Sequence, residues 1–397
     1  MNHLREAQRL QNNGLLVIGI VLVASTLRAP LTAVGPIIEQ IKLDLEINNG
    51  VAGMITTIPL LIFGIVSPFV SKMMARISMA HILCYALLLT MIALILRVSG
   101  GVIPFFVGTI MLGVSIACGN VTLPAYAKWQ FPLQIGVITG IYSATMNLTA
   151  GLGGGVSYPL SAMTSLGYRF SLIFWIVFVV MALLLWLPQT KRMTQSHYEK
   201  ETKATKVIAS KMAWAVALTM AFQSMTFYSV VAWYPSILIS KGVEAEWAGY
   251  FLMINQFAQL PMTFTFPILA EKMKNQRLLI LIIVVLMFTG FSLLFTTQVW
   301  ALILAMILTG MGIGACFSVC MTFFSIRART MKGSLALSGF GQSVGYLVAS
   351  LGPLLLGVSH DLTKTWNVAI VMLMCMAFCI LLVGLYASKS AYVEDDS

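Results

Sequence analysis

Long apolar runs constrain this chain more than any other feature of its sequence. Twelve of them recur along its 397 residues, and each is long enough to cross the hydrocarbon core of a bilayer as a helix. A mean hydropathy of +0.92 and a charged fraction of 9% leave too little polar surface for a water-soluble protein. Because a backbone in lipid must satisfy its own hydrogen bonds, the runs are predicted to be α-helices. We therefore expect an all-α membrane protein with twelve transmembrane helices.

The runs fall into two sets of six. They lie near residues 14–38, 50–70, 79–98, 102–126, 136–160, 170–188, 212–238, 246–269, 278–297, 299–324, 334–357 and 367–387. Between the sets, residues 189–211 are rich in Lys, Thr and Ser and lack apolar periodicity, as expected of a linker. We predict two pseudo-symmetric bundles: an N-terminal six-helix bundle over 1–188 and a C-terminal six-helix bundle over 212–397, joined by a cytoplasmic linker over 189–211.

The short loops between the runs indicate an orientation. If the N-terminus is cytoplasmic, that side carries 18 Lys and Arg with Arg28 left out. The opposite side then carries only five, which are Lys42, Arg97, Arg169, Lys241 and Lys364. Because positive loops remain in the cytoplasm, we predict a multi-pass protein of the cell membrane with both termini cytoplasmic. The segment before the first run lacks a small-residue cleavage site, so we expect the first helix to be retained.

Several function classes find no support in the sequence. The net charge of +11 is scattered among short loops and not gathered on one face, which argues against nucleic acid binding. The six cysteines lie in apolar runs without His or carboxylate neighbours, so they are interpreted as packing residues. Phosphate loops, nucleophile elbows and zinc signatures are missing. We expect no enzyme, catalytic residue, metal or cofactor; the expected partners are the lipid bilayer and a small-molecule substrate.

The first run contains one charged residue, Arg28, which should face the protein interior or a water-filled cavity. An Arg at the centre of a spanning helix costs roughly 2.5–3.5 kcal/mol on insertion scales. Pro30 and Pro36 are expected to bend or end this helix, and Thr32 shares a helical face with Arg28. One interpretation is that the guanidinium locks helices together by donating to carbonyls at the prolines. We favour ligand binding, since a guanidinium without an acid partner suits a small anion or a nitro or carboxylate group.

Other polar and aromatic residues inside the runs are candidates for the same site. Asn120 either points into a cavity or bonds a carbonyl freed by Pro124. A stripe of Gln223, Phe227 and Tyr228 could stack on a small planar solute, although such stripes more often pack helices together. The remaining amides could equally join helices by hydrogen bonds. The candidate substrate-binding residues are Arg28, Thr32, Asn120, Tyr142, Asn147, Gln223, Phe227, Tyr228, Asn255, Gln259 and Gln342.

Four segments, drawn from both halves of the chain, form a recognisable set. They are Leu27-Arg28-Ala29-Pro30, Asn120-Val121-Thr122-Leu123-Pro124, Trp233-Tyr234-Pro235 and Gln342-Ser343-Val344-Gly345-Tyr346. This set resembles the cyanate/2-nitroimidazole transporter family of the major facilitator superfamily. The resemblance implies a monomer with a central site between the halves, alternately open to each side. It also implies that the first, fourth, seventh and tenth helices line the cavity, with polar faces of the fifth, eighth and eleventh. One departure is the segment 67–76, which lacks the acid of the superfamily's usual gating ion pair.

These observations predict a secondary active transporter of a small anionic or polar planar solute, such as cyanate, nitrate, a carboxylate or a nitroimidazole. The alternative is a proton-coupled multidrug efflux transporter, which an acid embedded in the membrane would support. The acids of this chain fall in loops, tails or helix ends, and Glu39 is the nearest to a span. Moving one negative charge inward costs about 2.3 kcal/mol per 100 mV, so an anion needs a co-ion, an exchange partner or metabolic trapping to accumulate, whereas the same field helps its export. The sequence leaves the direction of transport open.

Overall fold

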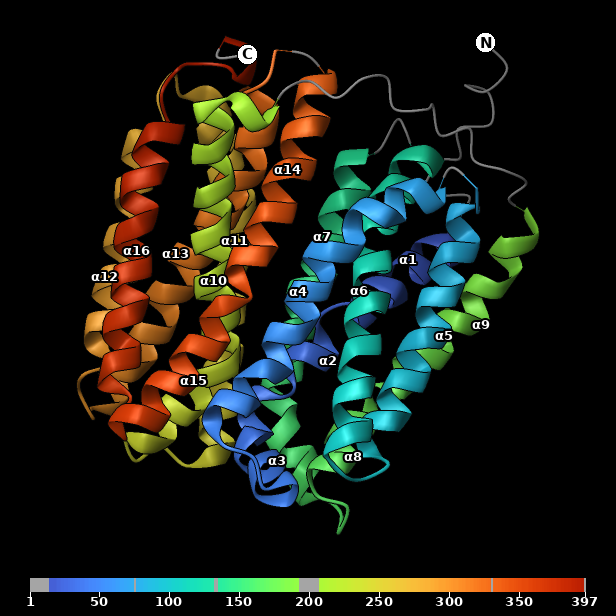
Figure 1. Ribbon diagram of the computed structural model, residues 1–397, viewed down its shortest axis with the longest axis vertical. Coiled ribbons are helices and arrows are strands. Elements are labelled where there is room, and N and C mark those ends of the chain that lie inside the picture. The colour runs from blue at the N-terminus through green and yellow to red at the C-terminus, as the bar shows by residue number, and fades with distance from the viewer. Residues whose placement is uncertain (1–13, 75, 132–134, 193–206, 330, 396–397) are drawn as a thin grey trace.

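The computed structural model describes residues 14–74, 76–131, 135–192, 207–329 and 331–395, which contain helices and turns but no strand. Their helices form twelve segments that run between the two ends of a bundle, as Figure 1 shows. The prediction of an all-α fold with twelve helical segments is confirmed. Residues 193–206 of the predicted linker and residue 75 of the segment 67–76 lie outside the described residues, so the bounds of the two bundles stay predictions.

Each predicted run corresponds to one segment of the structure. In the first half of the chain, α1 (Gly14–Thr26), α2 (Ala29–Thr32), η3 (Gly35–Ile37) and α3 (Ile38–Leu45) form the first segment, followed by α4 (Asn49–Met74), α5 (Met79–Val98), α6 (Val102–Gln130), α7 (Ile135–Ala162) and the pair α8 (Tyr168–Phe174) and α9 (Ile176–Arg192). The second half contains η4 (Val207–Ala209), α10 (Lys211–Ser240), α11 (Ala245–Lys272), α12 (Arg277–Leu293), α13 (Val299–Ile326), α14 (Met331–Ala349) with α15 (Leu351–Thr363), α16 (Asn367–Ala387) and η5 (Val393–Asp395).

Among the described residues, nine segments are both long and apolar enough to cross a membrane. The other three are α7, α11 and α12, of which α12 is apolar but has only 17 residues. Helices α7 and α11 pack against each other across the two halves, and their backbones approach closely: a Cβ at Gly249 would lie 2.9 Å from the carbonyl oxygen of Gly154. Their polar and glycine-rich composition therefore fits helices that face protein more than lipid.

The first segment is broken at the position of its arginine. Helix α1 ends at Thr26, and Arg28 is the N-cap of the short helix α2 with φ −123° and ψ −38°, outside helical geometry. Pro30 occupies the first turn of α2, where a missing N–H costs nothing, and Pro36 lies in the 3₁₀ turn that follows. The prolines thus interrupt the helix, as the sequence predicts.

The two halves are joined at the end of the bundle where α3, α8 and α15 lie (Figure 1). The carboxylate of Asp361 accepts hydrogen bonds from the backbone N–H groups of Asn49, at 3.3 Å, and Gly50, at 2.7 Å, at the start of α4. The Ser236 hydroxyl donates to Glu39 at 3.2 Å, again from one half to the other. An anion at a helix N-terminus is stabilised by unpaired N–H groups. This end, which the loop charges predict to be the outer one, is closed.

Candidate substrate site

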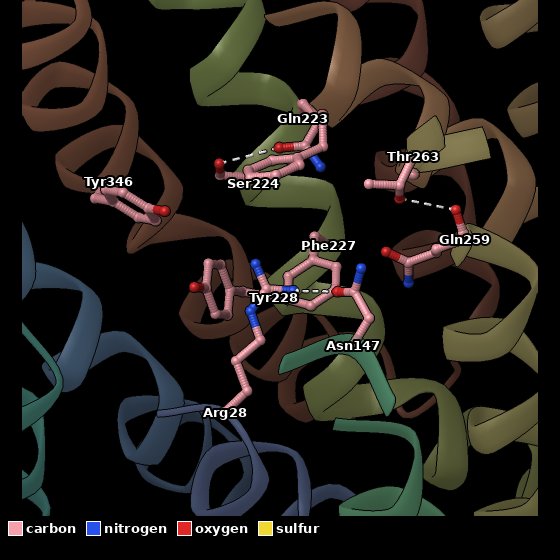
Figure 2. A pocket seen from close by; sticks show the side chains of 11 residues that line it. Arg28, Asn147, Gln223, Ser224, Phe227, Tyr228, Gln259, Thr263 and Tyr346 are labelled. Carbon is pink, nitrogen blue, oxygen red and sulfur yellow. Dashed lines mark hydrogen bonds between the residues drawn. The ribbon is translucent and has the colours of Figure 1, made fainter. Parts of the chain in front are cut away.

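A small pocket lies between the two halves, at the level of the break in the first segment. Figure 2 shows its side chains, which come from both halves of the chain. They are Arg28, Asn147, Gln223, Ser224, Phe227, Tyr228, Gln259, Thr263, Gly314, Phe317 and Tyr346. The free space at its centre is about 10 Å³, roughly the room that one water molecule needs. Side chains therefore nearly fill this pocket, and a bound solute requires them to move apart.

The guanidinium of Arg28 is the charged group of the pocket. Its Nη1 donates to Oδ1 of Asn147 at 3.0 Å. Its Cζ atom lies over the rings of Phe227 and Phe317, at 5.0 and 5.8 Å from their centroids. Ring faces attract a cation through their quadrupole. No acid in the described part of the chain forms an ion pair with Arg28, so its positive charge is held by an amide and two aromatic rings.

Helix α10 supplies one wall of the pocket. Gln223, Phe227 and Tyr228 lie four and five residues apart and share a face, as the sequence predicts. Ser224 joins them, and its hydroxyl donates to Oε1 of Gln223 at 3.1 Å. The amide of Gln223 in turn donates to the carbonyl of Ile313 at 3.3 Å. This wall therefore offers a flat aromatic surface next to an amide and a hydroxyl.

The opposite wall comes from α11 and α13. The amide of Gln259 donates to Oε1 of Gln256 at 2.9 Å, and the hydroxyl of Thr263 donates to the Gln259 carbonyl at 2.9 Å. Gly314 allows α13 to approach α11, because a Cβ there would lie 2.7 Å from the Cβ of Gln259. Phe317 follows one turn later on α13 and reaches the Arg28 guanidinium. This wall combines amides with one aromatic ring.

Tyr346 of α14 connects the pocket to the first half of the chain. Its ring centroid lies 4.1 Å from that of Phe63 on α4 and 6.3 Å from that of Tyr228. Sequence reasoning did not propose Tyr346, although it lies next to the candidate Gln342. It also missed Ser224, Thr263, Gly314 and Phe317 as lining residues. Ser224 and Thr263 are close in sequence to predicted residues, whereas nothing in an apolar run distinguishes Phe317 from a packing residue.

The structure brings six of the candidate residues together in the pocket and places five elsewhere. The six are Arg28, Asn147, Gln223, Phe227, Tyr228 and Gln259. Of the other five, Asn120 is half-buried on α6, and Tyr142 packs against the apolar core of the first half. Helix α6 contributes no lining residue from its described part. This helix is the fourth membrane segment, which the resemblance implies as a cavity wall, and its described residues do not line this pocket.

The remaining three candidates bond within their own half. The hydroxyl of Thr32 donates to the carbonyls of Arg28 and Ala29, at 3.3 and 3.2 Å. The amide of Asn255 donates to the Thr309 hydroxyl at 2.9 Å and to a carbonyl of α13, so it joins α11 to α13. Gln342 donates to Ser338 one turn earlier, at 3.0 Å. Of these three residues, Asn255 makes the helix-joining bond that the alternative interpretation describes, whereas Thr32 and Gln342 bond within their own helical segments.

A second arginine, Arg97, has the structural role that is the alternative interpretation of Arg28: it donates to a carbonyl at a proline. Its side chain is buried at the end of α5, with an exposed fraction of 2%. Its Nη1 donates to the carbonyl of Pro30 at 3.3 Å, and its Cζ lies 5.0 Å from the centroid of the Phe105 ring. The count of loop charges placed Arg97 on the outer side of the membrane, which stays a prediction. The structure adds that its side chain is buried, because α5 packs along α6 and the guanidinium lies over Phe105 and bonds Pro30.

Comparisons with known proteins agree with this architecture. The family model described as Major Facilitator Superfamily matches residues 17–353. The uncharacterized transporter YycB of Bacillus subtilis (strain 168) is 35% identical over 379 residues, which cover 95% of this chain and 94% of that protein. The 2-nitroimidazole transporter of Escherichia coli (strain K12) is 32% identical over 388 residues, 97% of this chain and 98% of that one.

Two more distant proteins also match, one in sequence and one in fold. The cyanate transport protein CynX of Escherichia coli (strain K12) is 24% identical over 352 residues, 88% of this chain and 91% of that protein. A solved nucleoside transporter has a TM-score of 0.77 over 94% of this chain and 100% of that chain, at 8% identity. The resemblance to 2-nitroimidazole and cyanate transporters is thereby confirmed. The chain belongs to the major facilitator superfamily and is a multi-pass membrane transporter of small solutes, not an enzyme.

Proposed function

We propose that the chain is a secondary active transporter of a small anionic or polar planar solute of the cyanate, nitrate, carboxylate or nitroimidazole type. The observation that carries this proposal is the guanidinium of Arg28 between the halves, bonded to a neutral amide and to no described acid. A cation in a weakly polarisable site attracts negative charge more strongly than one in water. A guanidinium also offers paired N–H donors that match a carboxylate or nitro group.

The walls of the pocket favour a flat solute. Phe227 and Phe317 lie against Arg28, and Tyr228 and Tyr346 line the adjoining space. Rings of this kind stack on planar molecules, while the amides of Gln223 and Gln259 can bond a polar edge. Two relatives are named for the transport of 2-nitroimidazole and of cyanate, which are small solutes with hydrogen-bond acceptor atoms. The positive charge of Arg28 in the pocket would repel the lipophilic cations that a multidrug efflux transporter carries.

The closed outer end supports transport by alternating access. Contacts of Asp361 with Asn49 and of Ser236 with Glu39 block one end of the bundle, so a solute would reach the pocket from the other end. In our proposal the bundles 1–188 and 212–397 rock about the linker 189–211, which breaks these contacts and opens the outer side. We further propose that both termini are cytoplasmic and that one chain suffices for transport.

Thermal stabilisation of the purified protein tests the proposal. The ligands are cyanate, nitrate, acetate, 2-nitroimidazole and a lipophilic cation, each at constant ionic strength. A ligand present at 100 times its Kd stabilises the native state by about 2.7 kcal/mol. We expect at least one anion or nitro compound to raise the Tm of the wild type and not that of Arg28→Gln.

A matched control removes a different positive charge. Arg169 pairs with Asp44 at the outer end, at 2.9 Å, and Arg169→Gln should keep the response to the ligand. Equal stabilisation of the wild type and Arg28→Gln by the lipophilic cation, with no response to any anion or nitro compound, would refute the proposal and favour efflux.

A further inference from the structure

Asn147 occupies a position from which a carboxylate would neutralise the pocket. Its side chain extends from α7, is 8% exposed and accepts a hydrogen bond from Nη1 of Arg28 at 3.0 Å (Figure 2). An aspartate has nearly the same shape as an asparagine and could accept the same hydrogen bond. The difference is one full negative charge within ion-pair distance of the guanidinium. At this position, therefore, one amide determines whether the pocket carries a net charge.

The rest of the pocket leaves that charge unbalanced. Its lining contains amides, hydroxyls and aromatic rings but no acid. The ion pairs of the described residues lie elsewhere, for example Arg169 with Asp44 at the outer end. In the described part of the chain, Asn147 is the only hydrogen-bond partner recorded for the Arg28 side chain. The donors at Nε and Nη2 are thus available to a bound solute.

We propose that Asn147 determines the charge selectivity of the site, an inference that rests on the proposed function. Its amide oxygen fixes one edge of the guanidinium without neutralising it, so the solute itself supplies the counter-charge. Its amide nitrogen remains a donor on the same side chain. An aspartate would replace that donor with an acceptor and would take the place of the anion as the partner of Arg28.

The physical reason is the cost of an unpaired charge in a buried pocket that has room for about one water molecule. An anion that leaves water loses its hydration, and attraction to an unpaired cation offsets that loss. If Arg28 were already paired with an acid, the ion pair would carry no net charge to attract the anion, and the carboxylate would repel it. Asn147 is thus a specificity residue, and an acid at this position selects against anions.

Binding of cyanate and nitrate to two pairs of variants tests this assignment by titration calorimetry. The wild type is compared with Asn147→Asp, and Asn147→Gln with Asn147→Glu, so each pair differs in charge at nearly constant shape. We expect the acid in each pair to raise the Kd of the anions at least about tenfold, which corresponds to about 1.4 kcal/mol. The Tm of the ligand-free acid variants should equal or exceed that of their amide partners, because a new ion pair forms with Arg28.

The outcomes separate this inference from the proposed function. Equal Kd values within both pairs would overturn the role of Asn147, while the proposed function stands if Arg28→Gln has lost binding. If the wild type binds no anion or nitro compound of the panel, the proposed function fails, and the charge assignment fails with it. A variant that does not fold is identified by its unfolding profile, and the second pair then decides the question.

Discussion

Arg28 and Arg97 are two arginines near the break in the first segment, and their surroundings look alike. The Cζ of each lies 5.0 Å from the centroid of a phenylalanine ring, and each donates one recorded hydrogen bond to an uncharged oxygen. The two arginines differ in which half of the chain supplies the aromatic ring that they contact. Arg97 contacts Phe105 and Pro30, both in the first half, whereas Arg28 reaches Phe227 in the second half.

This difference shows that an arginine in an apolar span is not by itself a sign of a binding site. A cation whose partners lie in its own half moves with that half as one body and contributes to its stability. A cation that contacts both halves experiences a change of surroundings when the halves separate or a solute enters. The orientation of the guanidinium, more than its burial, distinguishes a candidate ligand anchor from a structural link.

The largest effect in this comparison is expected from Arg97→Met. The change leaves the buried carbonyl of Pro30 without its recorded donor, which costs about 1–3 kcal/mol. We expect a Tm several degrees lower in detergent and a nitrate Kd within a few-fold of the wild type, measured by calorimetry. Loss of nitrate binding at unchanged Tm would place Arg97 with Arg28 and remove the distinction.

Arg28→Lys should affect binding without affecting stability. The ammonium keeps the positive charge but lacks the planar fork that can donate two parallel hydrogen bonds to one anion. We expect the Kd of nitrate or of a nitro compound to rise about tenfold, or about 1.4 kcal/mol, with a Tm close to that of the wild type. A lysine variant that binds as tightly as the wild type would show that charge alone, without fork geometry, suffices.

Replacing the phenylalanine ring beside each arginine, Phe227 beside Arg28 and Phe105 beside Arg97, should have a smaller effect than replacing the arginine itself. A cation over a ring face gains about 0.5–2 kcal/mol, depending on its exposure. Phe227→Leu should therefore raise the Kd of the bound anion several-fold, whereas Phe105→Leu should leave the Kd unchanged. Both rings are buried, at 5% and 1% exposure, so each change should lower the Tm. A raised Kd in Phe105→Leu and an unchanged Kd in Phe227→Leu, measured by calorimetry, would exchange the roles of the two arginines.

Thr32→Val should have the smallest effect. The Thr32 hydroxyl donates to carbonyls of its own turn, at 3.3 and 3.2 Å, and valine keeps the shape of the side chain. We expect a loss of stability of about 1 kcal/mol, the net value of one hydrogen bond, and an unchanged nitrate Kd. A clear rise of the nitrate Kd in this variant would return Thr32 to the binding site and extend the region around Arg28.

Much of the candidate site follows from the chemistry of residues inside the spans. A charged or amide side chain is costly in lipid, so Arg28, Asn147, Gln223 and Gln259 stand out in apolar runs, and all four line the pocket. The same argument selected Asn255, which instead bonds α13 within its own half. The free-energy cost of a polar side chain in lipid means that the side chain needs a hydrogen-bonding partner. This cost does not distinguish a partner in the protein from a bound solute.

Phe317 and Tyr346 illustrate what sequence reasoning cannot find. An aromatic ring is at home in an apolar run, and only the approach of α13 and α14 to the first half shows that these rings line the pocket. Arg97 is the converse case. Its place at the end of a run predicts a loop residue, and only the packing of α5 along α6, with the bond to Pro30, buries it.

The sequence by itself determined the twelve helical segments, the interruption at Pro30 and Pro36 and the presence of a cation in the first segment. These features are local: they depend on the length of apolar runs, on the missing N–H of proline and on the cost of charge in lipid. The tertiary structure alone decided which polar groups satisfy one another and which face the space between the halves. That choice depends on the rotation and spacing of helices far apart in the chain, which no local pattern encodes.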